Sequence, residues 1–451
     1  MKANWLPLSA AVALALGSVT ASAVDFHGYF RAGMQANTEG GAVYCLGNGN
    51  KGHRVGRLGD ECDTYAELAL SQEVYNKANS KFTVNTLVAY GSTEDFVDMQ
   101  GNSWQGVGGS GPWDGQRLSI RELYAKYDTA DGYSIWAGKR YYQRKDIHIL
   151  DLYYLNNSGY GAGIENIDVG MGNVAFAVTK WSMNEGESIE NWRNVYKLDA
   201  RWNAIPVGFG TVDASVIYAL PFISDTQKEA KVGSDKGLQN ANSGVLVTLE
   251  HNSTINTDAM SVMNKFVLQY GTNGFAYIAD FGNHAGDNYS PDTDVESVRL
   301  IDWGTLDAGN FGLGYSFIWS HKNSGDNHGD KGGNAAWTTN RSGWDYSIVL
   351  RPEYKWTEYT RTTLELGYSK TKTDGWQCDP AKFEDPDATK VTLAQQFTPG
   401  KGFWSRPAIR FYVSYMSGDL FANRWNPGYA SKNVDEDEEQ ITVGTQVEAW
   451  W

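Results

Sequence analysis

Charged and aromatic side chains are concentrated in one stretch, residues 138–155, which reads GKRYYQRKDIHILDLYYL. Carboxylates, guanidiniums and hydroxyls exchange hydrogen bonds with polar ligands, and aromatic rings stack on apolar faces. A second chemistry is conceivable, because Asp146 and Asp151 could form the acid/base pair of a glycosidase. The neighbouring Arg144 and Lys145 instead favour carboxylates that stay ionised and accept hydrogen bonds. Taken alone, the stretch also fits an exposed, solvated loop.

The pattern around this stretch predicts where it lies in the fold. Residues 134–142 alternate acceptably for a strand, which we expect to end near Gln143. Beyond Gln143 both alternate faces carry polar groups. We therefore expect a loop whose charges and rings are ordered by the structure around it.

The first 23 residues have the pattern of a cleaved signal peptide: Lys2, an apolar run over residues 7–16, and the small-residue site Ala21-Ser22-Ala23. We expect a single mature domain of residues 24–451, which is 451 − 23 = 428 residues. Loss of Lys2 takes the formal charge from −15 to −16, which disfavours nucleic acid as a partner. After these residues the sequence contains no run of about 18 apolar residues, so it predicts no membrane-spanning helix.

Composition favours a large β protein. The chain has 50 glycines, 11 prolines, 26 tyrosines and 17 tryptophans, and its mean hydropathy is −0.46. An exported, acidic chain of this kind suits a secreted carbohydrate-active sandwich or an outer-membrane β-barrel.

The three cysteines are widely spread. Cys45 and Cys62 enclose a glycine-rich loop, and we expect them to pair in an oxidising compartment. Cys378 has no obvious mate. A zinc site built on these cysteines is disfavoured, because the sequence has no second pair, Cys-x-x-Cys or histidine, at the spacing that zinc ligands need.

Strand alternation separates the two β classes. In five segments, polar or aromatic side chains occupy one face and apolar side chains the other: residues 25–35, 64–71, 81–90, 404–415 and 440–451. A soluble sandwich would not usually sustain this pattern over one domain without helices or linkers. A barrel with an apolar face toward lipid and a polar lumen explains it, and also explains the terminal Trp450-Trp451 as an interface anchor. Short turns alternate with long loops, as periplasmic turns and extracellular loops do.

The chain resembles the maltoporins over essentially its whole mature length. The resemblance rests on ordered strings: VDFHGYFR at 24–31, RLGDECDTYAEL at 57–68, WAGKRYYQRKDIHILDLYY at 136–154, GAGIENIDVG at 161–170, NKFVLQY at 264–270, TLAQQ at 392–396, WSRPAIR at 404–410 and the terminal WW. It implies an all-β, transmembrane antiparallel barrel of about eighteen strands with an inward-folded constriction loop. It also implies a homotrimer in the bacterial outer membrane that contacts lipid and conducts maltose, maltodextrins and ions.

The family's aromatic slide is a row of rings on which the apolar faces of sugars rest. Its pattern falls on Tyr29, Tyr65, Trp113, Trp404 and Trp450, with Met263 where the family has phenylalanine. Strand alternation independently places Tyr29, Tyr65, Trp404 and Trp450 on the polar, inward face. It also predicts that Met263 points inward and Phe266 outward. Trp113 lies in a loop, for which alternation makes no prediction.

The family's polar track maps onto further residues: Arg31, Arg57, Glu67, Arg121, Arg144, Asp146 and Asp151, with Tyr153 as the constricting tyrosine. The alternative for the arginine and aspartate pairs is a network that only rigidifies the loop, and both roles are compatible. The resemblance implies no enzyme activity, cofactor or metal. Leu155 stands where the family often has tryptophan.

Other functions stay open at this stage. The protein could be a general diffusion porin, in which the slide would bind no sugar. It could also be a porin for sucrose or β-glucosides, which would use the slide for another sugar. A secreted carbohydrate enzyme or lectin is the alternative from another class.

Overall fold

The computed structural model describes residues 24–40, 43, 45, 53–61, 63–93, 117–183, 193–222, 243–279, 294–324, 342–373, 387–418 and 439–451. The predicted signal peptide, residues 1–23, lies outside them and stays a prediction, as does any role for Cys378. Among the described residues, no helix has the length and apolar character needed to cross a membrane.

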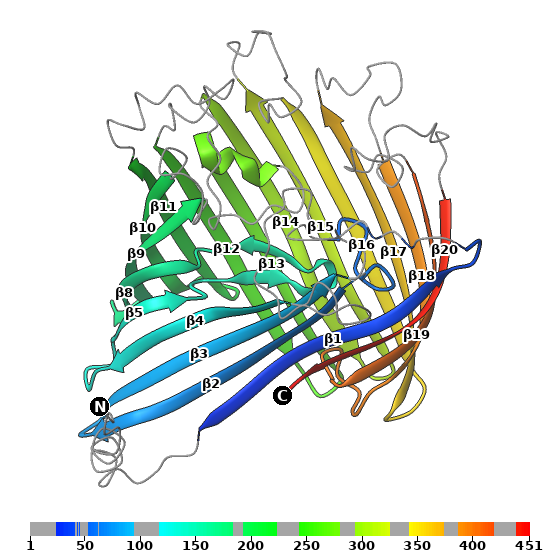
Figure 1. The fold of residues 1–451 in the computed structure, drawn as a ribbon, viewed down its shortest axis with the longest axis horizontal. Helices are drawn as coiled ribbons and strands as arrows, with labels where there is room; N and C mark the ends of the chain where they lie inside the picture. The colour runs from blue at the N-terminus through cyan, green and yellow to red at the C-terminus, as the bar shows by residue number, and fades with distance from the viewer. Residues whose placement is uncertain are drawn as a thin grey trace, which may run out of the picture.

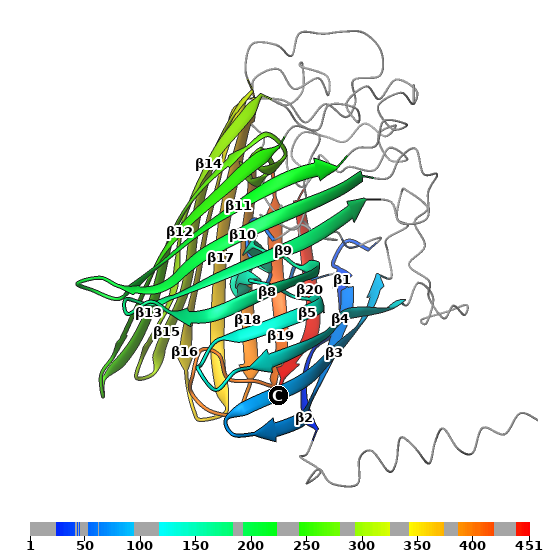
Figure 2. The same cartoon turned by 90° about the vertical axis from the view of Figure 1, so that its left-hand side faces the viewer.

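The chain forms one closed antiparallel β-barrel of 18 strands (Figures 1 and 2). The strands are β1 (Asp25–Asn37), β2 (Asp63–Lys77), β3 (Ser80–Thr93), β4 (Arg117–Asp128), β5 (Ser134–Arg140), β8 (Gly159–Asp168), β9 (Asn173–Met183), β10 (Arg193–Pro206), β11 (Thr211–Phe222), β12 (Gly244–Asn256), β13 (Met260–Thr272), β14 (Val295–Ala308), β15 (Phe311–Ser324), β16 (Gly343–Lys355), β17 (Thr360–Thr373), β18 (Asp387–Phe397), β19 (Ala408–Ser417) and β20 (Glu439–Trp450). Each pairs with its neighbour in the chain, and β1 pairs with β20. The predicted strand number is confirmed.

In the described part of the chain, four short elements lie apart from the barrel sheet. The strands β6 (Lys145–Ile147) and β7 (Leu152–Leu155) form a separate two-stranded sheet, and the 3-10 helix η1 (His148–Leu150) connects them. A second 3-10 helix, η4 (Asn273–Ala279), follows β13 and packs on β13 and β14.

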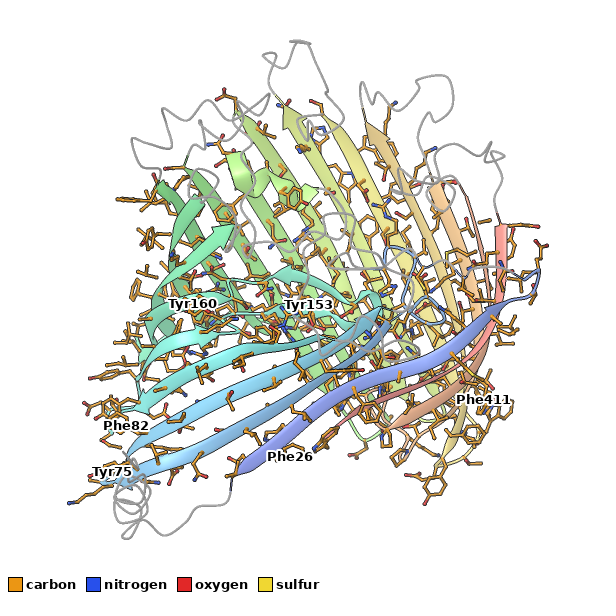
Figure 3. The ribbon with its side chains drawn as sticks, in the orientation of Figure 1. Phe26, Tyr75, Phe82, Tyr153, Tyr160 and Phe411 are labelled. Carbon is orange, nitrogen blue, oxygen red and sulfur yellow. The ribbon has the colours of Figure 1, made fainter. Side chains whose placement is uncertain are left out.

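The outer face of the barrel is apolar, as alternation predicts. Ile409, Phe411 and Val413 of β19 are 42% or more exposed, whereas Arg410 and Ser414 of the same strand are buried on the inner face. Figure 3 shows Phe82, Tyr160 and Phe411 at the edge of the barrel wall and Tyr153 within its outline. Because this pattern recurs around the barrel, the outside matches hydrocarbon and the inside matches water.

The seam between the first and last strands is sealed by the terminal residue. Gly28 and Trp451 exchange two backbone hydrogen bonds, of 3.3 and 3.2 Å. The Trp451 indole lies over Gly28, where a Cβ atom would overlap the ring, and its centroid is 5.6 Å from that of Phe26. Closure removes the two free edges that an open sheet would present.

Two predicted strand limits are wrong. The strand expected to end near Gln143 ends at Arg140, and the strand expected from Trp404 begins at Ala408. The second difference has a local cause, because Pro407 has no N–H to donate to the ladder and therefore precedes the strand. Trp404 lies in the turn before it.

A charge on the outer wall tests the assignment of that wall to lipid. Val413→Arg should lower the free energy of unfolding by about 2–4 kcal/mol, because it puts a guanidinium at mid-strand in the apolar belt. Val207→Arg, in the turn between β10 and β11 at the barrel rim, should cost at most about 1 kcal/mol. Urea titration of both variants refolded in lipid vesicles measures the difference; equal costs would mean that this wall does not face hydrocarbon.

Candidate functional site

Three segments fold into the barrel and narrow it. We call them the first inner segment (residues 53–61), the second inner segment (residues 141–158, which contains β6, η1 and β7) and the inner turn (residues 398–407). The first two are joined by backbone hydrogen bonds from His53 N to Leu150 O, 2.6 Å, and from Arg57 N to Ile149 O, 3.0 Å. The predicted inward-folded loop is the second inner segment.

An apolar stripe on the inner wall supports the second inner segment. Ile217 and Leu246 are cross-strand partners, and so are Val267 and Ile301; all four are buried. They belong to one cluster with Ile147, Ile149, Leu150, Leu152, Tyr154 and Leu155 of that segment. Burial of such side chains contributes roughly 1.5–3 kcal/mol each. The lumen is thus not uniformly polar, and Leu155 fills part of this apolar contact.

Polar bonds fix the register of the second inner segment on the wall. The Tyr154 hydroxyl donates to Glu250 Oε2, 2.9 Å, and Lys145 Nζ pairs with Asp213, 2.9 Å, and Glu250, 3.1 Å. Near the segment's end, Asn157 Nδ2 donates to Asp199 Oδ2, 2.8 Å. Both ends of the segment are therefore tied to β10–β12.

The first inner segment rests on β16–β18 at the opposite side. Its backbone approaches Gly367 so closely that a Cβ atom there would overlap the Val55 carbonyl. Leu58 N donates to Glu365 Oε1, 2.9 Å, and Lys390 Nζ donates to the carbonyls of Gly56 and Leu58. The buried charges of these strands thus serve to satisfy the backbone of an inward loop.

The inner turn is held by two strands that are not its neighbours along the chain. Arg361 of β17 donates to Gly400 O, 2.8 Å, and Gly402 O, 3.1 Å. Phe403 N donates to Asp307 Oδ2 of β14, 2.9 Å. Trp404, expected on a strand, therefore faces the lumen from a turn, packed against the buried cluster.

Five rings form a row inside the barrel. The centroid of Tyr65 is 6.3 Å from that of Tyr29, and Tyr29 is the cross-strand partner of Trp450. The His148 imidazole lies 5.4 Å from Trp450 and 5.3 Å from Trp404, edge-on to both rings. Four of the five residues were predicted for the slide, and His148 was not.

Met263 lies on the inner face of β13, as alternation predicts. It is partly buried and packs against the cluster that supports the second inner segment, and Lys265 on the same face pairs with Glu250, 3.1 Å. Phe266 points the other way and is 46% exposed. The ring at the family's phenylalanine position is therefore absent from the inner face here.

Glu448 is the centre of an ion cluster beside the rings. Its side chain is fully buried. Oε2 accepts hydrogen bonds from Arg406 Nε and Arg410 Nη2, each 2.8 Å. Oε1 accepts from the Tyr29 hydroxyl, 3.1 Å, and lies 3.2 Å from Arg57 Nη2. The carboxylate is therefore paired on both oxygens.

Arg31 connects the rings to the second inner segment. Nη1 donates to Asp151 Oδ2, 2.8 Å, while Nε and Nη2 form a bidentate pair with Asp63, 2.8 Å each. The guanidinium also lies over the Tyr65 ring, 5.3 Å from its centroid. Asp151 ends η1 with a left-handed backbone, φ 48°, which turns its side chain toward this arginine.

Arg144 is sandwiched between two tyrosine rings. Its guanidinium carbon is 3.9 Å from the Tyr141 centroid and 4.5 Å from the Tyr153 centroid. Oε1 of Glu67 lies 3.6 Å from Arg144 Nη1. The same oxygen accepts hydrogen bonds from the Tyr65 hydroxyl, 2.7 Å, and the Tyr141 hydroxyl, 3.1 Å. Tyr153, the predicted constricting tyrosine, is therefore stacked on a cation whose charge Glu67 balances.

Arg121 stands at a bulge in β4. Leu87 pairs with Glu122 and the next residue of β3, Val88, pairs with Ile120, so Arg121 is the extra residue. Bulges re-aim side chains. The contacts of Arg31, Glu67, Arg144 and Asp151 place these predicted track residues in one connected region.

Asp146 and Asp151 differ in acidity. Burial raises the pKa of Asp146, and the negative charge of Asp151 adds to that rise. Burial would also raise the pKa of Asp151, but the guanidiniums of Arg31 and Arg57 outweigh it and hold this pKa below its usual range. At Asp146 the positive charges of Arg144 and Arg57 oppose this rise without outweighing it. The expectation that both carboxylates stay ionised stays a prediction.

Sequence reasoning missed His148, Glu448 and Arg406 as site residues. Glu448 shares the inner face of β20 with Trp450, so alternation offered a signal, whereas nothing marked His148 for the space between two indoles. Burial lowers the pKa of His148 to about 4, so its ring is neutral at pH 7. Trp113 and Cys62 lie outside the described residues, so the role of Trp113 and the Cys45–Cys62 bridge stay predictions.

Comparison with known proteins gives one family. The LamB porin family model matches residues 24–451. A protein of Hahella chejuensis named maltoporin is 34% identical over 452 residues, covering 99% of this chain and 97% of its own. Among solved structures, OccAB2 of Acinetobacter baumannii (TM-score 0.48, 10% identity, 95% and 98% coverage) and OpdL of Pseudomonas aeruginosa (0.47, 11%, 95% and 98%) are similar.

The ion cluster can be tested through its central carboxylate. Glu448→Gln should lower the free energy of unfolding by about 3–5 kcal/mol, because it leaves buried guanidiniums unpaired. Glu439→Gln, the same change at the exposed end of the same strand, should have little effect. Temperature-dependent mobility of the folded barrel on gels and tryptophan fluorescence both report the loss; similar stabilities of the two variants would show that the arginines are balanced by other groups.

Proposed function

The chain belongs to the LamB porin family, and from that premise we propose that its barrel gives maltose and maltodextrins a passive, saturable path across the bacterial outer membrane. The barrel is a porin, and the family makes a sugar-specific porin the leading interpretation. We propose the homotrimer of the maltoporins as its assembly and a cleaved signal peptide, residues 1–23, as its export signal.

The main support for this proposal is the row of rings from Tyr65 to Trp404. A pyranose has apolar C–H faces that rest on aromatic rings and hydroxyls that need donors and acceptors. A row of similar, weak sites lets a sugar enter readily and also leave readily. The centroids of Tyr65 and Tyr29, and of His148 and each indole, are 5.3–6.3 Å apart, and the two groups meet where Tyr29 pairs with Trp450 across the strands. This spacing would allow a sugar to remain near a ring as it advances.

The charged groups beside the rings supply the polar half of the path. Arg31, Asp151 and Glu67 are each held by partners on other elements, so they meet a sugar hydroxyl without first being ordered. Such preorganisation lowers the entropic cost of binding. Charge-assisted hydrogen bonds are also stronger than neutral ones. We assign Arg57, Arg121, Arg144 and Asp146 to the same track and Tyr153 to the constriction.

Current block by a linear oligosaccharide tests the function. Addition of maltohexaose to single channels in a planar bilayer should reduce the ion current with a saturable concentration dependence, because the bound chain fills the narrowed lumen. Sucrose and a β-linked glucan oligomer, titrated in the same way, report preference. A current that stays constant across the titration would show a general diffusion pore, and stronger block by a β-linked chain would reassign the substrate.

Met263 offers a test of the slide at one position. Met263→Phe should tighten maltohexaose block more than maltose block, because a flat ring replaces a flexible thioether. Stacking beyond burial contributes about 0.5–1.5 kcal/mol, which limits the gain to roughly tenfold. Met260→Phe, on the same strand but 41% exposed, is the matched control. Unchanged constants for both sugars would place position 263 off the sugar path.

A further inference from the structure

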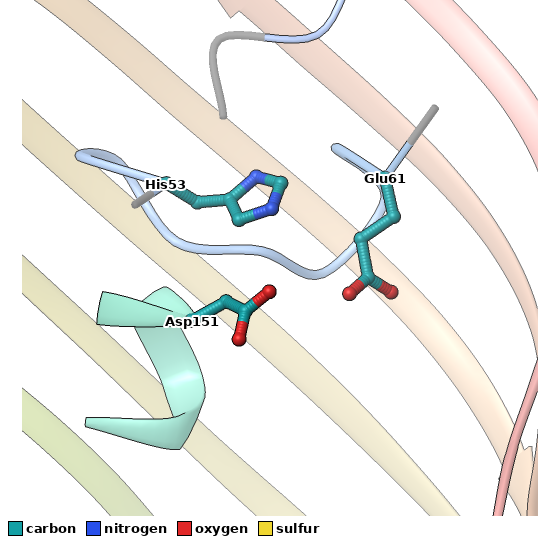
Figure 4. Close-up of side chains that lie close together, drawn as sticks. All are labelled: His53, Glu61 and Asp151. Atoms are coloured by element: carbon teal, nitrogen blue, oxygen red, sulfur yellow. The ribbon is translucent and has the colours of Figure 1, made fainter. Parts of the chain in front are cut away.

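A histidine and two carboxylates converge where the two inner segments meet. His53 and Glu61 belong to the first inner segment and Asp151 to the second, and each offers one ligand atom within 4.8 Å of the other two. Figure 4 shows the His53 imidazole facing the carboxyl groups of Glu61 and Asp151. None of the three residues belongs to the row of rings.

The surroundings of His53 are those of a histidine that binds a metal ion. Its side chain is almost completely buried, and Nδ1 is 2.9 Å from Oδ2 of Asp60, which is itself fully buried. A carboxylate on one ring nitrogen holds the proton there and leaves the lone pair on the other, as in carboxylate–histidine–metal sites. Among the described residues, no group hydrogen-bonds Nε2.

Each carboxylate keeps an oxygen for a further ligand. Arg31 binds Oδ2 of Asp151, and Arg57 Nε binds Oε1 of Glu61, 2.6 Å. Within the part of the chain that the structure describes, Asp151 Oδ1 and Glu61 Oε2 accept no hydrogen bond. Because a carboxylate has about four acceptor positions, both can bind a cation without releasing their arginines.

The local charge favours a cation. Four carboxylates, those of Asp60, Glu61, Asp63 and Asp151, surround two guanidiniums, those of Arg31 and Arg57, so −4 + 2 = −2. Glu448 with Arg406 and Arg410 adds −1 + 2 = +1. Glu365 with Arg351 and Lys390, under the first inner segment, also adds −1 + 2 = +1. The excess negative charge is therefore confined to the immediate surroundings of the three ligands, where a divalent ion would compensate it.

We propose that His53, Glu61 and Asp151 form a binding site for a divalent transition-metal ion of the Zn²⁺ type, with Asp60 as the positioning residue for His53. One nitrogen and two oxygens suit Zn²⁺ or Ni²⁺ better than Mg²⁺ or Ca²⁺, which prefer oxygen alone. With metal–ligand distances of about 2.0–2.2 Å, the three side chains need to approach by about 1 Å. The ion would join the two inner segments at the narrow part of the pore.

Metal binding to the purified, folded full-length barrel tests the proposal. Isothermal titration with Zn²⁺, after removal of metals with EDTA, should show one saturable site per chain that Mg²⁺ does not occupy at equal concentration. His53→Gln should weaken Zn²⁺ binding at least tenfold. His321→Gln, an exposed histidine at the far end of β15, should leave it unchanged. Equal Zn²⁺ binding by His53→Gln, or no saturable binding by the unmodified protein, would overturn the proposal.

Two further measurements guard against misfolding and adventitious sites. Asp60→Asn keeps all three ligands and should weaken Zn²⁺ binding by about 10–100-fold, as loss of an outer-shell carboxylate does. The ion should also reduce single-channel conductance in the unmodified protein and not in His53→Gln. If Asp60→Asn binds Zn²⁺ as tightly as the unmodified protein while conductance is insensitive to Zn²⁺, the ion binds elsewhere and the assignment is wrong.

Discussion

Backbone hydrogen bonding in a medium without water is the constraint on which this structure depends. A sheet that faces hydrocarbon must satisfy every N–H and C=O group within itself, so β1 pairs with β20 and the wall closes. Closure commits the outer face to apolar side chains and leaves the interior as the place for chemistry. The inner segments and the inner turn follow from this, because an eighteen-stranded barrel is too wide for wall side chains alone to surround a slender ligand.

Alternation predicted the wall well and the interior only in part. Tyr29, Tyr65 and Trp450 face inward because two-residue periodicity fixes the face once one residue is placed. Trp404 also faces inward, but for a reason that alternation could not supply, since Arg361 and Asp307 hold its turn over the lumen. Ile217 and Val267 look in sequence like lipid-facing residues. Their position under the second inner segment depends on a contact between elements far apart in the chain.

The interior contains many buried charges whose first effect is positioning. Desolvation makes a buried ion pair a weak source of stability, yet Glu365 with Lys390, and Glu448 with its arginines, fix inward loops that no ladder supports. We interpret this as the physical reason for a polar network in the lumen. It orders the groups that line the inner face of the barrel.

The contact between Val55 and Gly367 has a consequence for the order in which the chain folds. The first inner segment is near the N-terminus, yet its supports belong to β16–β18, which are synthesised some three hundred residues later. Contacts between residues so far apart form slowly because the intervening chain must first be ordered. The first inner segment can therefore reach its final position only after β16–β18 have formed, so the interior is completed late although its first segment lies early in the chain.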